Sequence, residues 1–362
     1  MIIFGSPRRY MQGPDAIDRL GEEVARLGRS AAIVADAQVT ALIGRRAADA
    51  CAAAGVALTA IPFGGEITFA EIERMEAGCG ALRPEVLIAA GGGKALDAGK
   101  LLGRRLGSRI VTVPTIASND APTSHIIVVY DAAHRIAAIE RLPANPDLVL
   151  VDTAIIARAP AILLSAGIGD AVVKRFEVAQ CAGNGGLNTF GGAPPIAAQV
   201  MAEACYATLR GHAEGGLAAV ARGAPDLALE RTVEACVLLS GLAFESGGLS
   251  ICHAMTRGLS AVPGPATALH GLQVAYALMV QLTLEGREAA FIDDLRGFFA
   301  RTGLPDSLAA LGFAGGAAEL QTIAALTVEA PHTKNFPRPL TAGDIVAAMR
   351  TVEDAAQRRK AA

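Results

Sequence analysis

The sequence predicts an α/β N-terminal domain with a parallel sheet, followed by an all-α C-terminal domain. Two observations support this. Short apolar, β-branched runs alternate with segments of helical periodicity over the first part of the chain. Such alternation is typical of a parallel sheet joined by right-handed crossovers, with helices on both faces. Strand patterns end at about Pro160, after which Gly and Pro breaks separate helical segments. We expect a Rossmann-like domain over residues 1–159 and a helical domain over residues 160–362.

The first domain is expected to contain strands and helices in regular succession. Residues 125–141 read as two strands joined at 131–134, a β-hairpin appended to the parallel sheet. The other expected elements are, in order, helix 13–29, strand 31–35, helix 38–54, strand 56–61, helix 69–82, strand 86–89, a helix after the glycines at 91–93, strand 110–113 and strand 147–151.

Composition excludes several classes of function. The chain has 362 residues and a formal net charge of −3, which argues against a nucleic-acid partner because phosphate binding needs a basic face. The longest uncharged window, residues 178–202, holds five Gly and two Pro and is not a membrane-spanning helix. The N-terminus lacks a signal-peptide pattern, and the six scattered cysteines form no CxxC. These features predict a cytoplasmic protein with no membrane partner and reduced thiols.

A glycine turn, Gly91-Gly92-Gly93-Lys94, follows a predicted strand and opens a helix. Backbone N–H groups and the helix dipole can hold a phosphate at such a place. Asp36, at the end of an earlier strand, can accept hydrogen bonds from an adenosine ribose, which favours NAD over NADP. The alternatives are a plain tight turn for the glycines and a helix N-cap for Asp36.

The polar loop 114–124 follows a predicted strand and should lie near the glycine turn, because ligands collect beyond the carboxyl ends of parallel strands. Its alternative is a loop of ordinary turn residues.

Asp170, His253 and His270 are candidate metal ligands. A carboxylate and two imidazoles can bind a divalent metal and leave a position open for substrate. The long spacing is no local signature, so packing histidines remain the alternative. Lys174 lies four residues after Asp170, on the same helical face. It can pair with Asp170 or Glu177, or reach toward an anionic substrate group.

Taken together and in order, these segments resemble the glycerol dehydrogenase branch of the iron-containing (group III) alcohol dehydrogenases. The resemblance extends over nearly the whole chain. It includes FGGEITFAEIERM (63–75), GGGKALD (91–97), PTIASNDAPTS (114–124), NPDLVLVDTAIIARAP (145–160), GIGD (167–170), LLSGLAFESGG (238–248), His253 and Leu269-His270-Gly271.

The resemblance implies a dehydroquinate synthase-like architecture and an NAD-dependent polyol dehydrogenase with its active site in the cleft between the domains. It implies a divalent metal on Asp170, His253 and His270, and a homo-oligomer of two to eight copies. Two imidazoles and a carboxylate suit both Zn²⁺ and Fe²⁺, and of the two we expect Zn²⁺. Asp120 would contact the polyol hydroxyls. The implied dinucleotide-binding residues are Asp36, Gly92, Gly93, Lys94, Asp97, Thr115, Ser118, Ser124, Ile126, Val128 and Tyr130.

The implied reaction is oxidation of glycerol or a related 1,2-diol to the hydroxyketone, with hydride transfer to NAD. Three departures from the family pattern concern the substrate end of the site: Lys174 replaces a small or neutral residue, Asn119 replaces a Thr, and residues 256–268 lack the usual histidines and aromatics. They leave open an NAD(P)H-dependent reductase of 2-oxo acids or of a phosphorylated polyol. A lyase of the dehydroquinate synthase type and a regulatory dinucleotide-binding protein are further alternatives.

Overall fold

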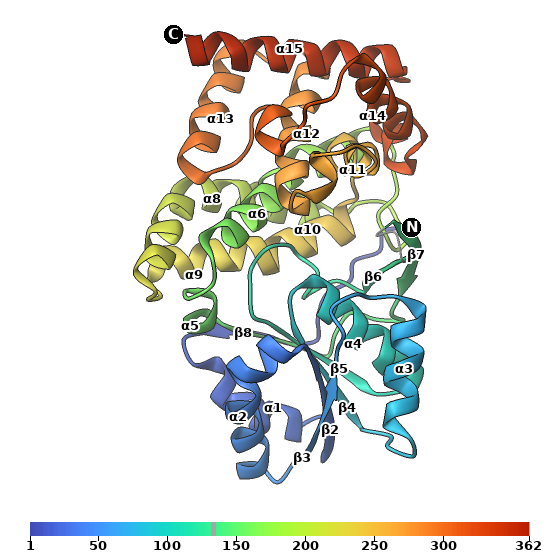
Figure 1. Ribbon diagram of the computed structural model, residues 1–362, viewed down its shortest axis with the longest axis vertical. Coiled ribbons are helices and arrows are strands. Elements are labelled where there is room, and N and C mark those ends of the chain that lie inside the picture. Colours follow the sequence, from blue (N-terminus) through green and yellow to red (C-terminus); the bar gives the residue numbers. More distant parts are fainter. Residues whose placement is uncertain (132–134, 362) are drawn as a thin grey trace. The chain divides into compact units, whose positions relative to one another are not determined.

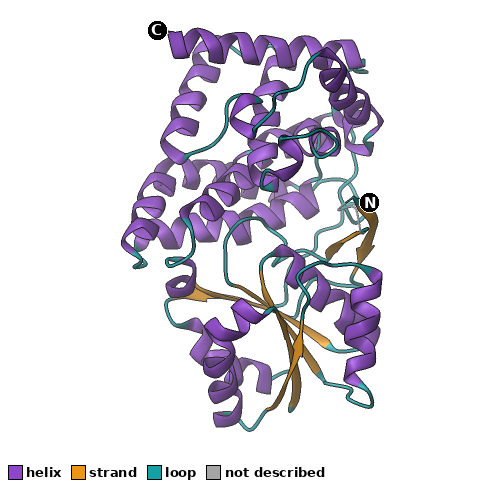
Figure 2. Cartoon of the chain, viewed as in Figure 1, coloured by secondary structure: helices purple, strands orange, loops and turns teal. Residues whose placement is uncertain are grey.

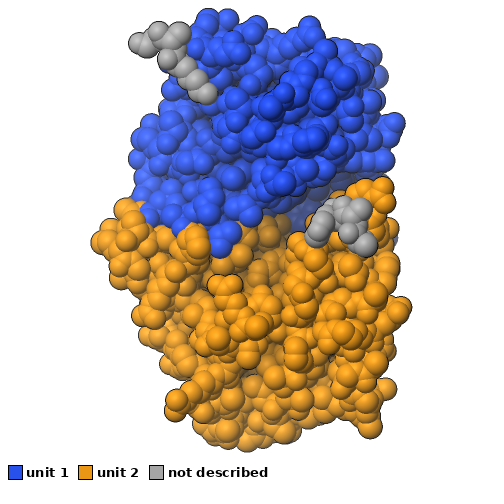
Figure 3. Space-filling model, viewed as in Figure 1, with its two compact units in different colours: residues 1–4, 161–217, 242–362 blue, residues 5–160, 218–241 orange. Residues whose placement is uncertain are grey.

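The computed structural model describes residues 1–131 and 135–361 and confirms an α/β domain with a helical partner (Figure 1). The chain forms two compact units (Figure 3). Unit 2 comprises residues 5–160 and 218–241, and unit 1 comprises residues 1–4, 161–217 and 242–362. The point at 160/161 is thus one of several at which the chain passes from one unit to the other. The return of residues 218–241 to unit 2 has no counterpart in the sequence pattern.

Every strand among the described residues, drawn orange in Figure 2, lies between residues 10 and 152 and so belongs to unit 2. Six of them form one parallel sheet in the order β1-β8-β5-β4-β2-β3. The strands are β1 (Tyr10–Gly13), β2 (Ser30–Ala35), β3 (Ala57–Pro62), β4 (Val86–Gly91), β5 (Arg109–Pro114), β6 (Ile126–Tyr130), β7 (Ile136–Arg141) and β8 (Leu148–Asp152).

Helices cover both faces of this sheet (Figure 1). On one face, Val39, Ile43 and Cys51 of α2 (Ala37–Ala53) pack in one cluster with α1 (Leu20–Ala25) and with the β2 side chain Ile33. On the other face, α3 (Phe69–Cys79) and α4 (Gly93–Leu106) pack with Val34. Successive side chains of a strand point to opposite faces of the sheet, so a continuous apolar strand makes both faces apolar. This is typical of parallel sheets covered by helices on both sides.

Two expectations for unit 2 need correction. In place of the single helix expected over 13–29, the structure has the end of β1, a 3₁₀ turn (Ala16–Arg19) and the short helix α1. A continuous helix cannot form there because Asp15 takes a left-handed conformation, with φ of 57°. The hairpin forms a separate two-stranded sheet, β6–β7, and does not pair with the six-stranded sheet. Its Ile127 and Val129 pack into the α3–α4 cluster instead. Residues 132–134 of its expected turn lie outside the described residues.

The rest of the described chain is helical. It contains α5 (Thr153–Ile156), α6 (Ala161–Val172), α7 (Lys174–Gly183), α8 (Ile196–Arg222), α9 (Leu227–Glu234), a π-helical turn (Ala235–Leu239), α10 (Ser240–Gly247), α11 (Ile251–Leu259), a 3₁₀ turn (Pro265–Thr267), α12 (His270–Leu284), α13 (Ala289–Thr302), a 3₁₀ turn (Ala309–Leu311), α14 (Ala317–Glu329), a 3₁₀ turn (Pro331–Asn335) and α15 (Ala342–Ala361). Within the described residues, no single helix has the length and apolar composition of a membrane span; one bent pair, Leu227–Gly247 with Ile251–Leu259, meets both criteria only in combination.

Candidate functional site

Asp170, His253 and His270 come together in unit 1. The last turn of α6 carries Asp170, while α11 and α12 present the two histidines from their first turns. One ligand atom of each residue lies within 4.8 Å of the others. Asp170 is buried, His253 is half-buried, and the His270 side chain is 47% exposed. Three convergent donors with one open side fit a divalent metal that keeps a position for substrate.

Close backbone contact between α6 and α12 creates this cluster. A Cβ on Gly271 would lie 1.8 Å from the carbonyl oxygen of Ala166, and a Cβ on Gly169 would lie 2.4 Å from the carbonyl oxygen of Gly271. Only glycine allows the two helices to approach so closely. Since Gly169 precedes Asp170 and Gly271 follows His270, the same contact brings the two donors together.

Glu177 fixes the orientation of His253. One oxygen of the fully buried carboxylate lies 2.5 Å from His253 Nδ1, and the other accepts the backbone N–H groups of Ser250 and His253 at 2.8 and 3.0 Å. The Nε2 atom of His253 then faces Asp170 Oδ1 at 3.2 Å. A carboxylate behind a histidine ligand fixes the ring and raises its basicity. Sequence reasoning treated Glu177 only as a possible partner of Lys174.

The sequence did contain a signal for Glu177. Asp170, Lys174 and Glu177 are spaced by four and three residues, a spacing that would place their charged groups on one face of a continuous helix. In the structure the helix is interrupted at Val173, between α6 and α7.

Lys174 points into the donor cluster. Its Nζ lies 2.8 Å from Asp170 Oδ1 and 3.2 Å from His253 Nε2, and the side chain is fully buried. The Phe244 ring centroid is 5.4 Å from the same nitrogen. Of the partners considered for Lys174, the structure thus shows Asp170.

Neighbouring charges shift the pKa values of Asp170 and His253 against the effect of burial. Burial alone would raise the pKa of Asp170, but the charge of Lys174 and the hydrogen bond from His253 hold this pKa well below its usual range. Burial would lower the pKa of His253, but Glu177 and Asp170 raise it to about 9. A metal can bind His253 Nε2 only when this nitrogen carries no proton.

The glycine turn in unit 2 fits a phosphate. The strand β4 ends at Gly91, whose φ of 136° favours glycine, and Gly92 is the N-cap of α4 without a side-chain cap. A Cβ on Gly93 would lie 2.8 Å from Asn119 Nδ2, so the loop crosses the start of the helix closely. The first-turn N–H groups of α4 and its dipole provide the donors that a pyrophosphate needs.

Other predicted dinucleotide residues have structural partners. Asp97 is buried, and its two oxygens accept hydrogen bonds from Val128 N at 2.9 Å and Lys100 Nζ at 3.0 Å. Lys94 pairs with Glu66 and lies near the Tyr130 ring. Asp36 caps α2 through Val39 N at 2.8 Å, which is the alternative that the sequence left open for it.

Polar contacts within unit 2 hold the loop that follows β5. Thr115 N donates to Gly91 O at 3.2 Å, and Ser124 Oγ accepts from Ile126 N at 2.9 Å. Asp120 is buried, and its Oδ2 accepts from Ser240 Oγ at 2.8 Å. Ser240, which follows the π-helical turn, therefore positions Asp120, a role that the sequence pattern did not reveal. Ser118 lies half-buried in the same loop.

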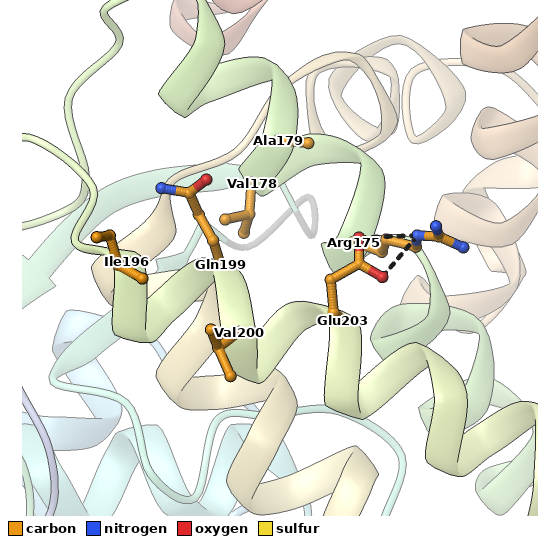
Figure 4. Close-up of a pocket in the computed structure, with 7 residues that line it drawn as sticks. All are labelled: Arg175, Val178, Ala179, Ile196, Gln199, Val200 and Glu203. Atoms are coloured by element: carbon orange, nitrogen blue, oxygen red, sulfur yellow. Dashed lines mark hydrogen bonds and ion pairs between the residues drawn. The ribbon is translucent and has the colours of Figure 1, made fainter.

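A hollow of about 360 Å³ in unit 1 lies on another face of α7 (Figure 4). Its lining includes Arg175 and Val178 from α7 and Ile196, Val200 and Glu203 from α8, and Arg175 pairs with Glu203 across it. None of its lining residues is a donor of the cluster, so we do not include it in the site.

Comparisons with known proteins agree with this geometry. The family profile described as iron-containing alcohol dehydrogenase matches residues 7–153. A glycerol dehydrogenase from Escherichia coli is 37% identical over 98% of both chains. The chain belongs to the iron-containing alcohol dehydrogenase family. Among its relatives in this family is a glycolaldehyde reductase from Halobacterium salinarum, which is 39% identical over 86% of this chain and 85% of that one.

Solved structures place this family member in the glycerol dehydrogenase branch. The crystal structure of glycerol dehydrogenase from Schizosaccharomyces pombe superposes with a TM-score of 0.95 at 32% identity, covering 99% of this chain and 92% of that one. Membership of the iron-containing alcohol dehydrogenase family implies NAD and a divalent metal as cofactors.

Proposed function

We propose that the protein is an NAD-dependent polyol dehydrogenase that oxidises glycerol or a related 1,2-diol to the hydroxyketone. The convergence of Asp170, His253 and His270, with donor atoms within 4.8 Å of one another, carries this proposal. The similarity to glycerol dehydrogenases over almost the full chain supports the polyol substrate.

In this proposal Asp170, His253 and His270 hold one divalent metal. When bound, the metal supplies Lewis acidity that lowers the pKa of a substrate hydroxyl, and NAD supplies the hydride acceptor. Glu177 keeps His253 Nε2 directed at the metal position. The exposed side of His270 leaves access for the diol. Asp120, held by Ser240, contacts the polyol hydroxyls.

The dinucleotide assignments are also proposals. Gly92 and Gly93 at the start of α4 contact the pyrophosphate, and Asp36 accepts from the adenosine ribose while it caps α2. The remaining proposed cofactor-binding residues are Lys94, Asp97, Thr115, Ser118, Ser124, Ile126, Val128 and Tyr130. Their support is their position on β6, near the start of α4 or in the loop after β5.

Three finer assignments complete the proposal. Zn²⁺ is the proposed metal; two imidazoles and a carboxylate suit Fe²⁺ as well, and reconstitution with each metal separates the two. All six cysteines are buried thiols that form no disulfide among the described residues, which supports a cytoplasmic location. We propose a homo-oligomer of two to eight copies, supported by the family resemblance.

The first test is NADH formation from glycerol and NAD⁺ before and after chelation, and again with Zn²⁺ restored. We expect turnover that chelation abolishes and Zn²⁺ restores. The His253→Ala variant should lose metal and activity, whereas His212→Ala, a half-buried histidine on α8, should keep both. No turnover by zinc-loaded protein would eliminate glycerol as the substrate.

The glycolaldehyde reductase relative favours one second candidate, reduction of a small hydroxyaldehyde with NADH. NADH oxidation with glycolaldehyde and with dihydroxyacetone would compare the two. A reductase of 2-oxo acids or of a phosphorylated polyol would instead need Lys174 as an anion anchor, and Lys174→Ala should then abolish that activity while sparing diol oxidation.

A further inference from the structure

The buried ammonium of Lys174 lies at the same atoms that the proposed function assigns to the metal. We propose that Lys174 is an internal cation that competes with the metal for Asp170 and His253. It stabilises the metal-free fold and weakens metal binding, and its ammonium leaves these atoms when the metal binds. This inference rests on the proposed metal site and concerns how that site is filled.

The competition follows from shared atoms. Asp170 Oδ1 is 2.8 Å from Lys174 Nζ, 3.2 Å from His253 Nε2 and 4.0 Å from His270 Nε2. Lys174 Nζ is also 3.2 Å from His253 Nε2. A metal bound to both Asp170 Oδ1 and His253 Nε2 would take up the space that the ammonium now fills, so the two cations cannot contact both atoms at once.

Charge strengthens the competition. In the metal-free cluster Lys174 offsets part of the charge of two buried carboxylates, Asp170 and Glu177. A divalent cation brought to the same oxygen is repelled by an ammonium at hydrogen-bond distance, and burial makes this repulsion stronger than in water. Metal affinity is therefore lowered for as long as the ammonium stays.

The Phe244 ring offers the displaced ammonium an alternative contact. Lys174 is the first residue of α7, and its four-carbon stem has several rotatable bonds. Its Nζ is already 5.4 Å from the Phe244 ring centroid, and the face of an aromatic ring attracts a cation. Small rotations of the stem can exchange contact with Asp170 for contact with this ring.

The test compares zinc affinity and thermal unfolding of the whole chain in wild type, Lys174→Gln and Lys174→Met. Zinc affinity is measured by competition with a chromophoric chelator. We expect both variants to bind Zn²⁺ at least tenfold more tightly than wild type. Their metal-free unfolding midpoints should fall, and the midpoint rise on adding Zn²⁺ should exceed that of wild type. Gln keeps a donor for Asp170 and thus separates charge from hydrogen bonding.

The matched control is Arg175→Gln, which removes one positive charge from the adjacent residue of α7. Arg175 pairs with Glu203 on another face of the helix, so zinc affinity should stay within threefold of wild type. Equal or weaker zinc binding by both Lys174 variants would overturn the proposal.

Variants that do not fold are also informative. A variant that folds only with Zn²⁺ supports the proposal, because the metal then supplies the missing positive charge. One that folds neither with nor without Zn²⁺, in both substitutions, contradicts it. Wild type that binds zinc and oxidises glycerol, while neither Lys174 variant binds zinc more tightly, would disprove only this inference. Failure of wild type and both variants to bind metal would remove the proposed metal site as well.

Discussion

A buried lysine–aspartate pair occurs in each unit, and the two pairs have different surroundings. In unit 2, Lys100 contacts Asp97 at 3.0 Å and donates to the carbonyl oxygens of Ala121 and Ile126. In unit 1, Lys174 contacts Asp170 at 2.8 Å, and its next partner is the side chain of His253. Backbone groups complete the first pair, whereas titratable side chains complete the second.

The different partners give the two lysine–aspartate pairs different roles. Backbone acceptors are fixed once the fold forms, so Lys100 holds α4 to the loop before β6 and to the first residue of β6. Imidazole and carboxylate groups can exchange partners, so the surroundings of Lys174 can accept a metal. Residue type and burial alone do not distinguish the two roles. The partners do.

The largest effect is expected from a substitution that breaks the lysine–aspartate pair of unit 2. Lys100→Met leaves Asp97 buried without its cation, and the free energy of unfolding should fall by about 3–5 kcal/mol. Zinc affinity should stay at the wild-type value in the protein that remains folded. Chemical denaturation and the chelator assay measure the two quantities. Weakened zinc binding would show that the two pairs are not as distinct as their contacts indicate.

A smaller effect is expected where α6 meets α12. Gly271→Ala places a Cβ 1.8 Å from the Ala166 carbonyl oxygen, and we expect a loss of about 1–3 kcal/mol of stability together with impaired zinc binding. Gly211→Ala, inside α8 and with no atom near its added Cβ, should instead gain up to about 1 kcal/mol. Zinc binding that survives Gly271→Ala would argue against backbone approach as the origin of the cluster.

Glu177→Gln tests the support behind His253. The amide keeps the shape of the side chain but loses the charge that orients Nδ1–H, so zinc affinity should fall about 10–100-fold. Glu203→Gln on α8, an exposed partner of Arg175, is the control and should change little. The measurement is zinc affinity, with the KM for glycerol as a second readout. Unchanged zinc affinity in Glu177→Gln would mean that ring packing alone orients His253.

The smallest effect separates two roles of Asp36. Asp36→Ala removes the cap of α2 and should cost about 1 kcal/mol of stability, whereas Asp36→Asn keeps a capping oxygen and should be nearly neutral. If the carboxylate also binds the ribose, both variants should raise the KM for NAD⁺. An unchanged KM for NAD⁺ in Asp36→Asn would mean that Asp36 only caps α2 and does not bind the ribose.

Much of unit 2 could be predicted from sequence, because its signals are local. The strands β2, β3, β4, β5 and β8 lie within two residues of their expected bounds, since each apolar run ends at a turn residue. The edge strand β1 was missed: Tyr10–Gly13 has no apolar alternation, and its pairing with β8 comes from tertiary contact. The left-handed Asp15 likewise interrupts a segment whose periodicity predicts one helix.

The sequence by itself determined the alternation of strands and helices, the glycine turn before α4 and, through its motifs, the family. These depend on neighbours in the chain, where periodicity and turn chemistry act directly. Only the tertiary structure decided that Lys174 points at Asp170, that Glu177 holds His253, and that residues 218–241 join unit 2. Lys174 had more than one possible partner in the sequence, and packing selected Asp170. Glu177 and His253 are 76 positions apart, so their contact depends on how α7 and α11 pack. Asp170 and His270 likewise meet only where the glycines at 169 and 271 let α6 approach α12.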